Sequence, residues 1–477
     1  MREDELGRLV DAYVDEVWND ALADLRALVR IPSVEDLSQA GPGMPYGPGP
    51  REALSCALDI ARRMGLQAHD CDGHIGYADV PGVDGRVIAT IAHADVVPAG
   101  EGWTMEPFEV TRREGLLVGR GVNDDKGALV ATLYAAQFFR RQVERTGRAL
   151  PHTLRVLVGC DEETHMDDVR WYVGHVGQPD FCFTPDADFP LICGEKGRLA
   201  GKFESPVLRG GALVEVAGGT VVNAVPSEAH AVVRADASAL APTEKVGVRD
   251  LGQGLARLDA TGVGGHAALP AESENAIGNL VDYLLANVAL SADERAFLEL
   301  EHLVCSASTD GSSLGIASSN DRFGPLTCIG GTVATEAAEG APGGLRLVQP
   351  IDSRYPDSTD AATMGRALSA LAAGHGSAFS VGEAKEPFYV DPASPEVQAL
   401  LSAYRDCTGD MTEPYVIGGG TYARNFAKAC AFGPIRPGTP KPGWAGNEHA
   451  ANESIAEGDL RLALKVYIMA IDRLMRI

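Results

Sequence analysis

The chain has 477 residues, more than a single domain usually contains, so two domains with separate cores are expected. Its 66 acidic residues outnumber 41 Lys and Arg, and the net charge of −25 disfavours nucleic acid or an anionic membrane as a partner. The nine cysteines include no C-x-x-C pair, which indicates reduced thiols rather than a disulfide framework or a zinc finger. No apolar run reaches membrane-spanning length and the first residues do not resemble a secretion signal, so we expect a cytoplasmic protein.

Helix-like and strand-like segments alternate through the first 199 residues. Apolar residues at helical spacing predict helices over residues 5–30, 51–64, 126–143 and 167–176. Apolar runs predict strands over residues 86–92, 153–159 and 181–184. This alternation predicts an α/β fold with a mixed or parallel sheet.

The pattern changes near residue 200. Short β-rich runs at residues 212–216 and 228–233 precede a helix-like segment, 274–288, and a hairpin-like pair, 327–335 and 345–351. Later, Ser394 and Pro395 are a good N-cap and first residue for a helix, and another helix is predicted over residues 459–475. We therefore predict a discontinuous first domain, residues 1–199 and 384–477, around an inserted α+β domain, residues 200–383.

Acidic residues and histidines gather where the predicted elements of the first domain begin or end. They are His93, Asp95, Asp124, Asp125, Glu162, Glu163, Asp186 and His449. The ends of strands in α/β sheets are the usual place for ligands, and buried carboxylates are costly without a cation. Two histidines and at least three carboxylates suit two divalent cations, so the sequence predicts a two-metal hydrolase site.

Each of these residues also has a simpler interpretation. Asp124 and Asp125 could cap a helix, and Glu162 and Glu163 could lie on a solvated face. His449 could be a surface histidine. The ordered set favours the metal site, while the role of Asp125 stays open between a ligand and a structural neighbour.

Five motifs together resemble those of the M20 metallopeptidases, most closely their bacterial dipeptidase branch. The motifs are His93-x-Asp95, GRGVNDDKG at residues 119–127, Asp161-Glu162-Glu163, Thr184-Pro185-Asp186-Ala187 and His449-x-x-Asn452-Glu453. They occur in the family's order and span nearly the whole chain. Ala92, Ala94 and Ala128 depart from the residues usual in relatives, which leaves the fine substrate preference open.

The resemblance implies a zinc-peptidase-like catalytic domain that holds two metal ions. His93 and Asp186 would bind one ion, Glu163 and His449 the other, and Asp124 would bridge both. Zinc is the expected metal, with manganese or cobalt as alternatives, because this ligand set accepts several metals.

Two further residues receive catalytic roles from the resemblance. Asp95 would orient His93, and Glu162 would be the general base that takes a proton from water and passes it to the leaving amine. The resemblance also implies a cis peptide bond between Asp124 and Asp125.

The inserted domain would act as a lid that contacts the substrate. His266 would stabilise the oxyanion, while Asn223 and Arg354 would hold polar ends of the substrate. Gly419, Gly420 and Thr421 would add backbone N–H donors to a substrate carboxylate. Turn formation and a loop hinge are the alternative roles for these residues.

The leading hypothesis is a monomeric dipeptidase that cleaves small peptides with a free carboxylate, in which the lid replaces a dimer partner. The nearest alternatives are an N-acyl-amino-acid amidohydrolase or a carboxypeptidase of the same family. A hypothesis of another class is a scaffold protein that binds metal without catalysis.

Overall fold

The computed structural model describes residues 3–338 and 340–477, which form two compact units. The first unit contains the chain up to Cys193, together with Tyr389–Tyr415 and Gly420–Ile477. The second contains Gly194–Phe388 and Val416–Gly419. The chain leaves the first unit within strand β9 (Ile192–Glu195) and returns within β23 (Phe388–Tyr389).

The larger sheet of the first unit is mixed. Its strands lie in the order β1 (Gln67–Cys71), β2 (Ile75–Val80), β6 (Thr153–Gly159), β3 (Val87–His93), β7 (Phe181–Thr184), β25 (Ala429–Ala431), β9 and β23, and β24 (Tyr415–Ile417) pairs with β9. Strands β6, β3, β7 and β25 are parallel neighbours, whereas β1, β2 and β9 pair antiparallel. The predicted α/β class with a mixed sheet is confirmed.

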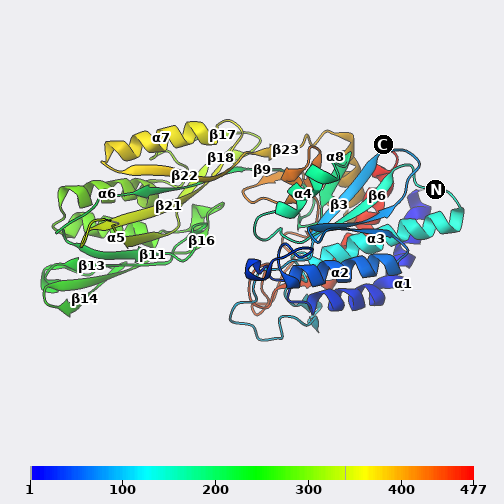
Figure 1. The fold of residues 1–477 in the computed structure, drawn as a ribbon, viewed down its shortest axis with the longest axis horizontal. Helices are drawn as coiled ribbons and strands as arrows, with labels where there is room; N and C mark the ends of the chain where they lie inside the picture. The colour runs from blue at the N-terminus through cyan, green and yellow to red at the C-terminus, as the bar shows by residue number, and fades with distance from the viewer. Residues whose placement is uncertain (1–2, 339) are drawn as a thin grey trace. The chain divides into compact units, whose positions relative to one another are not determined.

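Helices cover both faces of this sheet (Figure 1). They are α1 (Glu3–Val29), α2 (Pro48–Arg63), α3 (Lys126–Thr146), α4 (Asp167–His175), α8 (Pro395–Thr408) and α9 (Glu457–Leu474). Leu54 and Leu58 of α2 lie against Gly76 of β2, whereas the next residue, Tyr77, packs edge-to-face on Tyr172 of α4. Since successive strand residues face opposite sides, α2 and α4 lie on opposite faces. None of the helices in the described part of the chain is both long and apolar enough to cross a membrane.

The observed elements agree closely with the apolar patterns of the first unit. Strands β6 and β7 have the predicted bounds, and β3 is shifted by one residue. Helix α8 begins at Pro395 as predicted, but the expected Ser394 cap is wrong in one respect, because no hydrogen bond from its side chain caps the helix.

The second unit is an antiparallel sheet covered by helices, as its predicted α+β pattern requires (Figure 1). The strand order is β14 (Val246–Gly252), β15 (Leu255–Thr261), β13 (Glu228–Arg234), β11 (Leu213–Gly218), β20 (Val333–Ala337), β21 (Leu345–Tyr355), β10 (Gly197–Glu204) and β22 (Ala378–Lys385), and β19 (Thr327–Gly330) pairs with β21. The helices are α5 (Ala276–Asn287), α6 (Ala292–His302) and α7 (Ala361–Gly374). Leu280, Phe297 and Leu368 from these three helices are fully buried in one core with the sheet.

Candidate active site

His93 and Asp124 form the centre of the candidate site. His93 is the last residue of β3, a parallel strand in the interior of the sheet, and Asp124 lies two residues before α3. His93 Nε2 lies 2.8 Å from Asp124 Oδ1. The other ring nitrogen, Nδ1, donates to the backbone carbonyl of Asp95 at 3.0 Å, and the Asp95 carboxylate lies 3.5 Å from it. These contacts orient the ring so that Nε2 faces the carboxylates.

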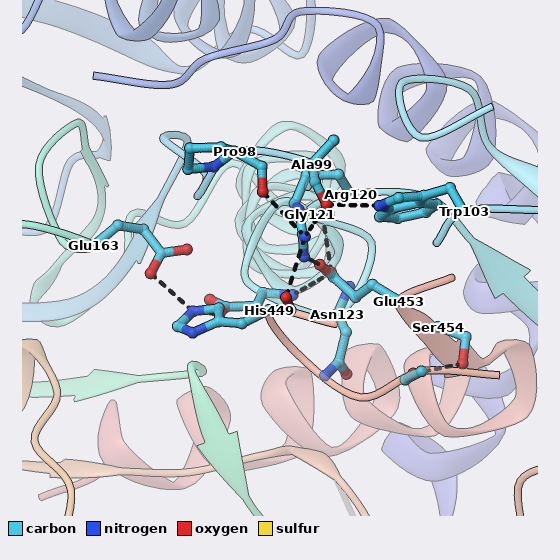
Figure 2. Close-up of polar contacts among 12 residues, drawn as sticks. Pro98, Ala99, Trp103, Arg120, Gly121, Asn123, Glu163, His449, Glu453 and Ser454 are labelled. Carbon is cyan, nitrogen blue, oxygen red and sulfur yellow. Dashed lines mark hydrogen bonds and ion pairs between the residues drawn. The ribbon is translucent and has the colours of Figure 1, made fainter. Parts of the chain in front are cut away.

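The second oxygen of Asp124 contacts His449. His449 Nε2 lies 2.9 Å from Asp124 Oδ2 and 2.9 Å from Glu163 Oε2, and Figure 2 shows Glu163 beside His449. Asp186, just after β7, has its Oδ2 3.7 Å from His93 Nε2. The structure thus brings together the five predicted metal ligands, with Asp124 between the two imidazoles.

The acidic side chains crowd one another strongly. Burial, followed by the charge of Asp124, raises the pKa of Asp186 to about 8. Burial and the Asp124 charge also raise the pKa of Glu163, and burial with the Asp186 charge raises the pKa of Glu162 well above its usual value. Such a cluster needs protons or cations to offset its negative charge.

The donor set fits divalent cations. His93, Asp124 and Glu163 place three ligand atoms within 4.8 Å of one another, and His93, Asp125 and Asp186 do the same. Within the described residues, the buried Oδ1 of Asp125 has no hydrogen-bond partner. Imidazole nitrogen and carboxylate oxygen are ligands that zinc, manganese and cobalt accept.

The side chain of Asp125 is fully buried in the candidate site. Its other oxygen, Oδ2, accepts a hydrogen bond from the backbone amide of His93 at 3.3 Å, and it does not cap α3. The peptide bond between Asp124 and Asp125 is cis, as the resemblance predicted. Asp125 therefore supports the strand end that carries His93.

Glu162 and Glu163 lie in the turn between β6 and α4, and Asp168 holds the start of this turn. Asp168 Oδ2 accepts hydrogen bonds from the amides of Cys160 at 2.7 Å and Asp161 at 3.2 Å. The sequence analysis missed Asp168, although an acidic residue in the first turn of a predicted helix was a usable signal. The backbone before the two glutamates is thus fixed by a buried carboxylate.

Asn223 and His266 are neighbours in the second unit. The Asn223 carbonyl accepts the amide of Ala267 at 3.0 Å, and strand β12 (Ala224–Val225) pairs with β16 (Gly265–His266). Burial, followed by the nearby charge of Arg354, lowers the pKa of His266. A neutral imidazole at this position can donate a hydrogen bond to a substrate oxygen.

Arg354 is buried near the end of β21. Its Nε lies 2.5 Å from Asp352 Oδ1, and its Nη1 donates to the carbonyl of Gly418 at 2.6 Å. Gly419 follows in the second unit, whereas Gly420 and Thr421 belong to the first. The Thr421 hydroxyl accepts the amide of Ala423 and caps the short helix Tyr422–Asn425. Arg354 and the glycine run are therefore directly linked.

Comparisons with known proteins show the family and the fold of the chain. The model of the family described as Peptidase family M20/M25/M40 matches residues 89–473. A Staphylococcus epidermidis protein named "Putative dipeptidase" is 31% identical over 479 residues, covering 96% of this chain and 97% of its own length. Similar folds occur in an M20 metallo-carboxypeptidase from Sulfolobus solfataricus (TM-score 0.58, 17% identity, 96% of this chain and 99% of the other) and human carnosine dipeptidase 1 (TM-score 0.57, 15% identity, 99% of both chains).

Proposed function

Because this chain belongs to the peptidase family M20/M25/M40, we propose that it is a dipeptidase that hydrolyses the peptide bond of dipeptides with two divalent metal ions. The observation that carries this proposal is the position of Asp124, whose two carboxylate oxygens face His93 and His449 separately. A carboxylate in this position is suited to bridge two cations.

Five residues would hold the metal ions. His93 and Asp186 would bind one, Glu163 and His449 the other, and Asp124 would be shared by both. When bound, two such cations lower the pKa of water and stabilise negative charge on the scissile carbonyl oxygen. Zinc is the proposed metal, and manganese and cobalt are chemically acceptable alternatives.

Glu162 is the proposed general base. Burial and the charge of Asp186 raise the pKa of this carboxyl group, which makes its carboxylate a better proton acceptor. Glu162 would take a proton from the attacking water and deliver it to the leaving amine. Asp95 would keep His93 in the orientation required for metal binding, through its contacts to Nδ1.

We propose that the first unit is the catalytic domain and that the second is a lid that contributes substrate contacts. His266 would donate to the oxyanion, and Asn223 would bind a polar group of the substrate. Arg354 would bind the substrate carboxylate, supported by backbone N–H groups of Gly419, Gly420 and Thr421. A monomer is the proposed state, because the resemblance implies that the inserted domain occupies the place of a dimer partner. The acidic composition and the cysteine pattern support the cytoplasm as the proposed location.

The decisive experiment compares three substrate classes on the purified, metal-loaded protein. Turnover of dipeptides that exceeds turnover of tripeptides and N-acyl amino acids by at least tenfold is expected. Preferential turnover of N-acyl amino acids would instead support an amidohydrolase, and turnover of longer peptides from the C-terminus a carboxypeptidase. If the protein cleaved none of the three substrate classes, the proposal would be rejected and a metal-binding scaffold would be supported.

A further inference from the structure

Behind the proposed metal site, Arg120 and Glu453 form an ion pair that is closed off from solvent. Arg120 Nη1 lies 2.6 Å from Glu453 Oε2, and the two side chains are 1% and 0% exposed. A buried ion pair is weak evidence for stability by itself, because the loss of hydration opposes the attraction. Its remaining contacts therefore indicate what the pair does.

Glu453 holds the segment that leads to the bridging carboxylate. Its Oε1 accepts hydrogen bonds from three backbone amides, those of Gly121 at 2.9 Å, Asn123 at 3.0 Å and Asp124 at 3.2 Å. Glu453 is itself anchored, since strand β27 (Ser454–Ala456) begins at the next residue and pairs with β5 (Leu116–Val118). The carboxylate thus joins a fixed strand end to the loop before α3.

Arg120 holds the loop that carries His449. Its Nη2 donates to the carbonyl oxygens of His449 at 3.3 Å, Pro98 at 3.3 Å and Ala99 at 3.1 Å, and Figure 2 shows these groups around the guanidinium. Pro98 and Ala99 lie on the loop that follows β3. One guanidinium therefore ties the His449 loop to the loop that follows His93.

His449 needs such support from its surroundings. Its side chain is 54% exposed, so packing contributes little to its position. Its φ of +61° lies in the left-handed region, which residues other than glycine rarely adopt unless neighbouring contacts impose it. The hydrogen bond from Arg120 to the His449 carbonyl is one of those contacts.

We propose that Arg120 and Glu453 are positioning residues for the metal ion held by Glu163 and His449. Breaking the contact between Arg120 and Glu453 would weaken the binding of this ion and leave the affinity for the other ion unchanged. The inference rests on the proposed two-metal function. The other ion would persist because His93 is held by β3 and Asp186 follows β7, so neither depends on the His449 loop. Asp124, which both ions would share, keeps its amide contact to Glu453 when only the contact between Arg120 and Glu453 is broken.

Two variants separate the contacts of the pair. Arg120→Met removes every donor while keeping an unbranched side chain of similar length. Glu453→Gln keeps an oxygen for the three amides but places a second donor, or an uncharged oxygen, against Arg120. Asp79→Asn is the matched control, because it disrupts another shielded ion pair of the first unit, to Arg155 at 2.7 Å, away from the ligands.

The first measurement is a titration of metal-free protein with Mn²⁺ alone, in which calorimetry measures the affinity for each ion and electron paramagnetic resonance detects spin coupling between the ions. Wild type and Asp79→Asn are expected to bind two ions with a spin-coupled spectrum. Arg120→Met and Glu453→Gln are expected to bind one ion with unchanged affinity and the second at least tenfold more weakly, with an uncoupled spectrum at one equivalent.

The second measurement is hydrogen exchange of the metal-free proteins. Amides of residues 446–453 are expected to exchange at least tenfold faster in both variants, and at the wild-type rate in Asp79→Asn. The inference would be overturned if both variants kept the wild-type metal affinities and amide exchange rates. It would also be overturned if the variants weakened the binding of both ions equally.

The design stays decisive when Arg120→Met does not fold, because Glu453→Gln preserves shape and the amide contacts and then gives the answer. A wild-type protein that binds fewer than two ions would contradict the proposed function instead. In that case the exchange rates of residues 446–453 still test whether the pair positions the loop.

Discussion

The hydroxyl of Tyr422 donates a 2.5 Å hydrogen bond to Asp168 Oδ2, the same oxygen that accepts the amides of Cys160 and Asp161. Both side chains are fully buried. The contact joins the segment after the glycine run to the turn that carries Glu162. A buried pair thus supports the turn that carries the proposed general base.

Replacing Asp168 with Ala is expected to lower kcat by about 10- to 100-fold, the usual range for residues that orient a catalytic group. KM is expected to stay within about twofold, since the substrate contacts are unchanged. Tyr422→Phe removes one hydrogen bond and is expected to lower the free energy of unfolding by about 1–2 kcal/mol. Steady-state kinetics and thermal unfolding measure the two effects, and a KM increase without loss of kcat would contradict the proposed role.

Glu162→Gln is expected to reduce kcat by at least about 10²- to 10⁴-fold, because the amide cannot accept the proton from water. Both metal ions are expected to remain, which elemental analysis of the purified variant checks. Glu448→Gln is the control, because Glu448 is an exposed acid next to His449. Retained activity in Glu162→Gln would show that another group is the base.

Arg354→Met is expected to lower kcat/KM for dipeptides by about 10- to 100-fold, as expected for a lost hydrogen bond between charged groups. The kcat/KM for C-terminally amidated dipeptides should fall much less, because these substrates lack the carboxylate that Arg354 would bind. Arg198→Met is the matched control, since Arg198 pairs with the same Asp352 carboxylate at 2.8 Å. Equal losses for both substrate types would contradict carboxylate recognition by Arg354.

Glu301 is expected to make the stability of the second unit sensitive to pH. It is fully buried, neither carboxylate oxygen has a hydrogen-bond partner within the described residues, and burial raises its pKa to about 8 from an ordinary value of 4.5. A raised pKa in the folded state means that its contribution to stability is complete below pH 4.5. It is lost as pH rises towards 8, by at most about 1.4 kcal/mol per pH unit.

Glu301→Gln keeps the group neutral and is expected to flatten this dependence. The variant should therefore gain melting temperature relative to wild type at pH 8 but not at pH 4.5. Glu299→Gln, an exposed change on the same helix, should follow wild type. Parallel curves for wild type and Glu301→Gln would show that Glu301 does not titrate in this range.

The sequence predicted the α/β class and the family, and both are confirmed. Apolar runs such as residues 153–159 are informative, because a short and nearly continuous apolar run is typical of a strand that is buried on both faces of a sheet. The contacts of Asp168, Arg120 and Glu453 were not predicted. They join segments up to 333 positions apart, and local patterns carry no information about which distant loop a buried charge meets.

The separation of the ligands along the chain has a consequence for biosynthesis. His93, Asp124, Glu163 and Asp186 leave the ribosome before the whole second unit, whereas β25, an interior strand between β7 and β9, and His449 follow it. The larger sheet of the first unit therefore lacks an interior strand during translation until residues 429–431 emerge. A nascent chain arrested after Phe388 would carry four of the five proposed ligands on an incomplete sheet, so the proposed second metal position would be completed only after His449 emerges.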